Sequence, residues 1–373
     1  MADLQDHPYD PSADPPASAV GELDGPSGAA EPPAEAPAAD RVHHDRAHAL
    51  LGAHPVIDGH NTLAQELLRT HWPDLERGES SLDTDIPRIR AGGVGAQFWS
   101  LLPAPDEGDE PPRTLTRTLE RIDVVRRLIA SCPENLRLAL TAGCLSDARS
   151  CGRVASLLGP VSGPALGDSI GTLRAYHALG VRSANVAGAR WAADGLTGFG
   201  QEVVREMNRL GILVDLSGAS AETMRHVLAV SDAPVICSRS AAHALTPHPA
   251  NVPDDILLTL RANGGVCMVS FAPEQVARPP QPATLKDVAD HLDHVREVAG
   301  SECVGLSGTY GMAVHAPHTL GLEDASCYPN LIAELLRRDW SDTDVAALTW
   351  QNAARAVRET ELVARAATLG TLL

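Results

Sequence analysis

Eight short apolar runs that alternate with amphipathic stretches are the feature that most restricts how this chain can fold. The runs are too short for core helices and contain many β-branched residues, so they predict buried β-strands. The stretches between them, such as residues 198–211 and 220–231, carry apolar residues at helical spacing. The predicted strands are residues 55–60, 94–101, 154–161, 181–188, 212–218, 233–240, 265–271 and 303–309.

Eight strands with helices between them predict an α/β fold, a (β/α)₈ TIM-type barrel. A doubly wound open sheet is the alternative, but "GGVG" at residues 92–95 is a weak match to its phosphate-binding turn. Two helix starts fit the barrel. Pro253 and the acidic pair after it are typical of a first helical turn, and Ser341 with Asp344 forms a variant of the capping box.

The chain divides by composition into residues 1–42 and residues 43–373. The first segment is rich in Pro, Ala, Gly and acidic residues, and cannot bury enough apolar surface to offset its ordering entropy. We therefore predict a disordered arm followed by the barrel. The arm lacks the basic start and apolar centre of a signal peptide, and no run of apolar residues is long enough to predict a membrane span.

The charge and cysteine content restrict the partners and the compartment. A formal net charge of −18 argues against nucleic acid and anionic membranes as partners, because both require a basic surface. The 7 cysteines are an odd number without a C-x-x-C pair, a pattern typical of free thiols. We therefore expect a cytoplasmic location.

The stretch "HPVIDGHNTLAQEL", residues 54–67, ends an apolar strand in a polar cluster. With "GGVGAQFWS", "APVICS", "NVPDDIL" and other stretches from about residue 43 to 360, it resembles a bacterial member of the membrane (renal) dipeptidase family. The resemblance implies a TIM-type barrel, a homodimer and a site with two zinc ions that hydrolyses dipeptides.

Barrel enzymes carry their chemistry at the carboxyl ends of the strands, and a two-zinc site needs imidazole and carboxylate ligands there. In the family the first strand ends in His-x-Asp; this chain retains His60 and has Thr62 in place of Asp. Three further metal positions are replaced as well. Val161 occupies the position of the bridging Glu, and Gly218 and Arg239 occupy positions of zinc-binding His residues.

The family's substrate positions are also replaced. Gly188 corresponds to a His after the fourth strand, Ala250 to the Arg that binds the substrate carboxylate, and Thr309 to an Asp after the last strand. Of eight family positions only His60 is retained, so we expect no bound zinc and no other cofactor.

Arg239 is the most informative replacement, because its fixed positive charge would repel Zn²⁺. Strict alternation along the first strand places Asp58 on the same side as His60, so Asp58, His60 and Arg239 form a predicted remodelled pocket. An Asp58–Arg239 ion pair would be purely structural. The alternative is an anion-binding pocket for a carboxylate ligand.

Other side chains could rebuild a metal site, but none of them has a recognisable ligand spacing. Cys237 lies on the predicted sixth strand. The loop histidines are typical of solvated surface residues: His243, His248, His315 and His318.

Three hypotheses of function follow. The first is a non-hydrolytic pseudoenzyme that binds a small peptide-like or carboxylate ligand or a protein partner, as a homodimer or as a heteromer with an active paralogue. The second is a metal-independent biosynthetic enzyme that uses Arg239, His60 and Asp58 as polarising and acid–base groups. The third is an active zinc dipeptidase.

Overall fold

The computed structural model describes residues 38–70, 72–78, 80–104, 113–312 and 316–370. Most of the predicted arm, residues 1–37, lies outside the described residues. Helix α1 (Ala38–Ala53) begins within the segment that we assigned to the arm, so residues 38–42 are helical. Among the described residues, none of the helices combines the length and apolarity that crossing a membrane requires.

Nine parallel strands form one sheet in the order β3-β4-β2-β1-β9-β8-β7-β6-β5. All eight predicted strands are confirmed. The additional strand, β3, was missed because its three residues show no pattern of their own. The bounds are β1 (Val56–Asn61), β2 (Val94–Trp99), β3 (Leu136–Leu138), β4 (Val154–Leu158), β5 (Ser183–Asn185), β6 (Leu213–Asp215), β7 (Val235–Ser240), β8 (Val266–Ser270) and β9 (Val304–Ser307).

The sheet closes on itself between β4 and β5. The start of β4 pairs with β3, and the chain at the end of β4 meets β5 through two isolated parallel bridges, Leu158 with Val181 and Val161 with Ala184. Without β3 the remaining strands make the eight-stranded barrel that the sequence predicts. The (β/α)₈ fold class is confirmed.

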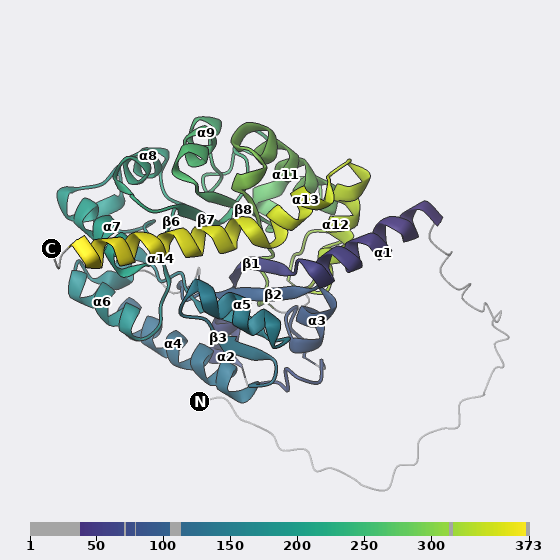
Figure 1. Ribbon diagram of the computed structural model, residues 1–373, viewed down its shortest axis with the longest axis horizontal. Helices are drawn as coiled ribbons and strands as arrows, with labels where there is room; N and C mark the ends of the chain where they lie inside the picture. Colours follow the sequence, from purple (N-terminus) through teal and green to yellow (C-terminus); the bar gives the residue numbers. More distant parts are fainter. Residues whose placement is uncertain (1–37, 71, 79, 105–112, 313–315, 371–373) are drawn as a thin grey trace, which may run out of the picture. The chain divides into compact units, whose positions relative to one another are not determined.

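Helices surround the barrel, and α14 runs across the front of it in Figure 1. α1 packs against α12, and α14 contacts α5, α7 and the strands β6, β8 and β9. The helices after α1 are α2 (Leu63–Arg69), α3 (Ile86–Ala91), α4 (Arg113–Ser131), α5 (Ala142–Ser150), α6 (Ile170–Ala178), α7 (Gly198–Leu210), α8 (Ala221–Val230), α9 (Asp254–Asn263), α10 (Pro273–Val276), α11 (Leu285–Ala299), α12 (Tyr328–Arg337), α13 (Asp342–Ala346) and α14 (Asn352–Gly370). Short helical turns are η1 (Gly163–Leu166), η2 (Arg190–Ala192), η3 (Ser301–Cys303) and η4 (Ala347–Gln351).

The helix ends follow the sequence signals. Pro253 is the residue before the first turn of α9, and Gly264, in the left-handed conformation with φ +74°, ends that helix. Ser341 and Asp344 form both bonds of the capping box at the start of α13.

The barrel interior is apolar and is closed at one end. Ile57, Phe98 and Met268 pack inside it with Trp350 of η4 and Ala353 of α14, in a hydrophobic cluster separate from the larger one between the sheet and its helices. η4 and α14 thus pack against the end of the barrel where the strands begin, and the opposite end is the mouth.

Two strands carry irregularities that change which way their side chains point. Their pairing registers shift between Asp58 and Asn61 in β1 and between Cys237 and Ser240 in β7. An extra residue in a strand breaks the alternation of faces. Ile57 faces the interior, so Asp58 faces the opposite side, whereas His60, beyond the shift, faces the mouth. The prediction that Asp58 and His60 share a side is therefore wrong.

Candidate functional site

A cavity of about 460 Å³ lies at the mouth of the barrel. Its described lining comes from β1, α2 and β7 and from the segments that follow β2, β8 and β9. No described lining residue comes from β4, β5, β6 or the loops after them, so the cavity occupies one half of the mouth.

Four of the predicted site residues meet in this cavity: His60, Thr62, Arg239 and Thr309. His60 and Arg239 reach it from the ends of β1 and β7. The Thr62 hydroxyl donates to the carbonyl oxygen of Tyr310 at 3.2 Å, which ties the segment after β1 to the segment after β9. Thr309 has φ +53°, a conformation that turns the chain after β9.

The other family positions do not line the cavity. Val161 is buried, and its amide and carbonyl bond to β5. Gly188 and Gly218 are exposed turn residues with φ +74° and +75°. Ala250 accepts a hydrogen bond from the Ser240 hydroxyl at 2.5 Å through its carbonyl oxygen.

His60 is 4% exposed, and its Nδ1 atom has no hydrogen-bond partner in the protein. Burial, and then the nearby charge of Arg239, hold the pKa of His60 well below its usual value. The imidazole is therefore neutral at neutral pH.

Within the described residues, the Arg239 side chain forms no hydrogen bond and no ion pair, and its Nε atom is buried without a partner. Burial lowers its pKa, opposed by the charges of Asp215 and Glu274, but a guanidinium stays protonated. Its backbone amide donates to Ser217 Oγ at 3.0 Å, which fixes the end of β7 against the segment after β6.

The predicted Asp58–Arg239 pair is absent from the described residues. Asp58 Oδ1 instead accepts hydrogen bonds from the backbone amides of His60 at 3.1 Å and Gly308 at 2.9 Å. Burial outweighs these bonds and raises the pKa of Asp58 to about 6. The carboxylate bonds to backbone amides and does not line the cavity, so Asp58 does not belong to the pocket.

Asp215, at the end of β6, is a buried residue that sequence reasoning missed. Its carboxylate accepts five hydrogen bonds, one from Asn185 Nδ2 and one each from the amide and hydroxyl of Ser217 and of Ser238. The network joins the ends of β5, β6 and β7. An Asp at the end of an apolar run, in "ILVD", was the signal available in the sequence.

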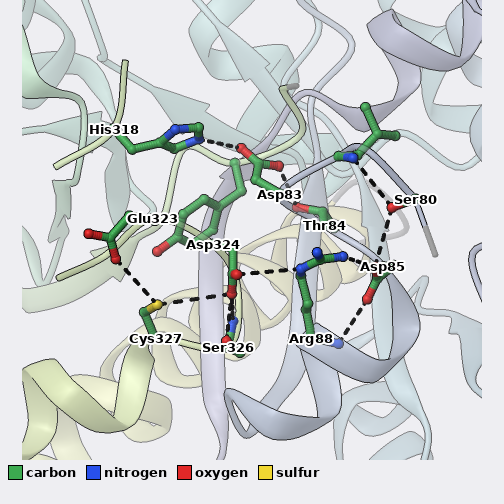
Figure 2. Close-up of polar contacts among 12 residues, drawn as sticks. Ser80, Asp83, Thr84, Asp85, Arg88, His318, Glu323, Asp324, Ser326 and Cys327 are labelled. Atoms are coloured by element: carbon green, nitrogen blue, oxygen red, sulfur yellow. Dashed lines mark hydrogen bonds and ion pairs between the residues drawn. The ribbon is translucent and has the colours of Figure 1, made fainter. Parts of the chain in front are cut away.

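Asp83 holds the segment after β9, which walls the cavity. Asp83 Oδ1 accepts from the amides of Gly311 at 2.7 Å and Met312 at 3.1 Å. His318 Nε2 donates to Asp83 Oδ2 at 3.0 Å (Figure 2). The hydrogen bond to Asp83 raises the pKa of His318. His318 therefore pairs with a carboxylate in this structure, and no sequence spacing pointed to its partner.

A second set of ionic contacts, made by Arg88, lies beside the Asp83–His318 pair in Figure 2. Arg88 bonds to Asp85 and contacts Asp324 at 3.4 Å between Nε and Oδ2. The segment around residues 80–88 is thus joined to the segment around residues 316–327 by ionic contacts at two points.

The other proposed replacement ligands are scattered. Cys237 is buried beside Cys267, and that contact with burial raises its pKa well above the usual value. His243 is exposed, and His248 Nδ1 accepts from the Ala250 amide at 3.2 Å. His315 lies outside the described residues.

A closed parallel barrel with a cavity at the carboxyl ends of its strands defines the class of (β/α)₈ barrel proteins in which hydrolytic sites are common. The family model for membrane dipeptidase (Peptidase family M19) matches residues 44–370, and the chain belongs to this family. The recognition made from the sequence motifs is confirmed.

Curated relatives agree with this assignment. Dipeptidase 3 of Macaca fascicularis is 41% identical over 338 residues, which cover 85% of this chain and 67% of that protein. Human dipeptidase 3 is 40% identical over 338 residues, with the same coverage of 85% and 67%.

Solved structures agree in fold. The probable dipeptidase PvdM from Pseudomonas aeruginosa superposes with a TM-score of 0.77 at 20% identity, over 87% of this chain and 99% of that one. Dipeptidase AC, a metallo peptidase of family M19, gives a TM-score of 0.73 at 26% identity, over 82% and 98%. A metallo peptidase from Rhodobacter sphaeroides, liganded with a phosphinate mimic of L-Ala-D-Ala, gives a TM-score of 0.73 at 24% identity, over 82% of this chain and 99% of that one.

The family implies a metal centre, and the side chains at the mouth do not fit one. Zinc needs three or four protein ligands, and a two-zinc site needs a bridging carboxylate. Across the described residues, no group of three or more His, Cys, Asp or Glu side chains is arranged to hold a metal ion. At the positions that the sequence motifs predict as metal ligands, the cavity presents the imidazole of His60, the hydroxyl of Thr62 and the guanidinium of Arg239.

Proposed function

We propose that this chain is a non-hydrolytic member of the membrane dipeptidase family that binds a small peptide-like or carboxylate ligand at the barrel mouth. The observation that carries the proposal is Arg239, a guanidinium in the cavity at the position of a zinc-binding His. A cation at this place opposes metal binding, and the neighbouring family positions supply no carboxylate that could offset it.

Hydrolysis in this family would need a metal-bound hydroxide at neutral pH. His60 is one imidazole, and the Asp58 carboxylate nearest to it along the chain points away from the cavity. Among the described residues, the mouth therefore has side chains that can bind and orient a ligand, but no set of ligands for a metal-bound hydroxide.

The cavity suits a binding role. Its volume of about 460 Å³ lies within the range of roughly 300–1,000 Å³ that is typical of small-molecule sites. Asp83 and Arg88 hold one wall through several hydrogen bonds, so the cavity keeps its shape without a ligand.

The repurposed metal-independent enzyme is the second candidate, favoured by the neutral imidazole of His60 beside the charge of Arg239. The proposed third member of its catalytic set, Asp58, does not reach the cavity. Assembly as a homodimer or with an active paralogue, and a cytoplasmic location, stay predictions.

Zinc content tests the proposal directly. Because the mouth supplies one imidazole and a guanidinium at the ligand positions, protein incubated with Zn²⁺ and then gel-filtered is expected to retain well under one zinc per chain. Elemental analysis makes the measurement, with an active M19 dipeptidase treated identically as the control. Two tightly bound zinc ions would restore the peptidase hypothesis.

Hydrolytic activity is the second test. With a panel of L,L- and L,D-dipeptides and added zinc, release of free amino acids is expected to equal the buffer blank. The Arg239→His variant should be equally inactive, since Thr62, Val161 and Gly218 still lack donors. Turnover that is abolished by a chelator and co-purifies with the chain would refute the proposal.

A further inference from the structure

We propose that the floor of the mouth cavity binds the carboxylate of a small monocarboxylic acid between the guanidinium of Arg239 and the imidazole of His60. This inference rests on the proposed binding function and names the class of ligand. The proposed anion-binding residue, Arg239, stands at a family metal position at the end of a strand. The Arg that binds the substrate carboxylate in the family lies in a loop, and this chain has Ala250 there.

Two buried polar atoms without partners indicate a ligand. Arg239 Nε and His60 Nδ1 are both buried with no hydrogen bond to the protein, and both residues line the same cavity. Buried polar groups nearly always have a partner. Among the described residues that line this cavity, these are the two with such atoms.

The charge around Arg239 is unbalanced. Asp215, the carboxylate that most influences it, is occupied by five hydrogen bonds from other groups. Asp58 is bonded to two backbone amides, and Glu274 is exposed at the rim. The Arg239 side chain is only partly exposed, and its Nε atom is buried without a partner, so an anionic ligand would lower the free energy of this cation.

The backbone that carries Arg239 is held in place. The register shift in β7 turns Arg239 into the mouth, and its amide is bonded to Ser217 Oγ. Nε–H and a terminal N–H of one guanidinium match the two oxygens of a carboxylate. His60 Nδ1, buried without a partner and in the same cavity, can donate to the same group.

The other side chains that line the cavity indicate the chemistry of the rest of the ligand. Leu102, Phe271 and Leu322 give it an apolar wall, which suits an apolar body. Glu66 and Glu274 also line the cavity, together with Arg69, so the lining adds no net positive charge beyond Arg239 for a second carboxylate. The lining therefore suits a monocarboxylate with an apolar body.

Isothermal titration calorimetry of metal-free protein tests this with N-acetyl derivatives of Ala, Val, Leu and Phe, each paired with its neutral amide. At least one acid is expected to bind, with its amide weaker by on the order of 100-fold. Arg239→Gln should weaken the acid by a similar factor. Arg365→Gln, the same change of charge on α14 at the closed end, should leave the affinity unchanged.

Equal binding of acid and amide, no binding of any acid, or unchanged affinity in folded Arg239→Gln would each overturn the inference. Displacement of the acid by an equal concentration of inorganic phosphate would overturn the choice of a monocarboxylate. The comparison of acid with amide uses the unaltered protein, so it stands even where a variant fails to fold. Zinc analysis of the same sample distinguishes failure of the proposed function from failure of this inference. Two bound zinc ions would contradict the proposed function. Metal-free protein that binds none of the acids would contradict only this inference.

Discussion

Replacement of Asp215 by alanine is expected to lower the free energy of unfolding by about 3–5 kcal/mol. The carboxylate is buried, and its removal leaves the amide and hydroxyl donors of Ser217 and Ser238, with Asn185, without their acceptor. Unmade hydrogen bonds of buried donors carry their full desolvation cost. Equilibrium denaturation with urea at neutral pH measures the change.

The matched control is Asp232→Ala, because Asp232 is exposed and its side chain has no bonded partner among the described residues. The free energy of unfolding of this variant should stay within about 0.5 kcal/mol of that of the unaltered protein. Asp215→Asn, which keeps one acceptor oxygen, should fall between the two. A loss below about 1 kcal/mol in Asp215→Ala would contradict the importance of the network.

Replacement of Asp58 by asparagine is expected to stabilise the protein at pH 8 by about 3 kcal/mol and to have little effect near pH 4. Burial raises the pKa of Asp58 from 3.8 to about 6, so the folded protein binds this proton more tightly than the unfolded chain does. The stability that Asp58 contributes is therefore present below pH 3.8 and is lost as the pH rises through about 6.

Asparagine cannot ionise, and both backbone bonds of Asp58 end on one oxygen, Oδ1, which an amide oxygen can replace. The free energy of unfolding, measured by urea titration at intervals from pH 4 to pH 8, gives the comparison. Asp232→Asn serves as the exposed control and should show no such trend. A difference between Asp58→Asn and the unaltered protein that stays constant with pH would contradict the assignment.

The sequence predicted the barrel because its strands are apolar and similarly spaced, and each long run became a strand. It did not predict β3, whose three residues pair with the start of β4 only because the closing barrel brings them there. The register shifts in β1 and β7 could not be predicted from the sequence either, because a bulge depends on the strand with which its own strand pairs. That is why Asp58 was placed on the wrong side.

The cavity residues His60, Thr62, Arg239 and Thr309 could be found because family motifs mark the ends of the strands. The pair of Asp83 and His318 could not, because it joins segments far apart in the sequence. Such contacts depend on the folded chain and leave no spacing to detect. Sequence reasoning therefore named four residues that line the cavity, but not the contacts that hold its wall.

The closure of the barrel has a consequence for its internal motions. Between β4 and β5 the barrel is joined by two isolated bridges, whereas β1 and β2 share a longer ladder. Local opening starts where few hydrogen bonds hold the backbone, so the seam at β4 and β5 is one place where the barrel should open transiently. Every described lining residue of the mouth cavity belongs to the other half, so the seam can part transiently while the arginine and its neighbours keep their positions.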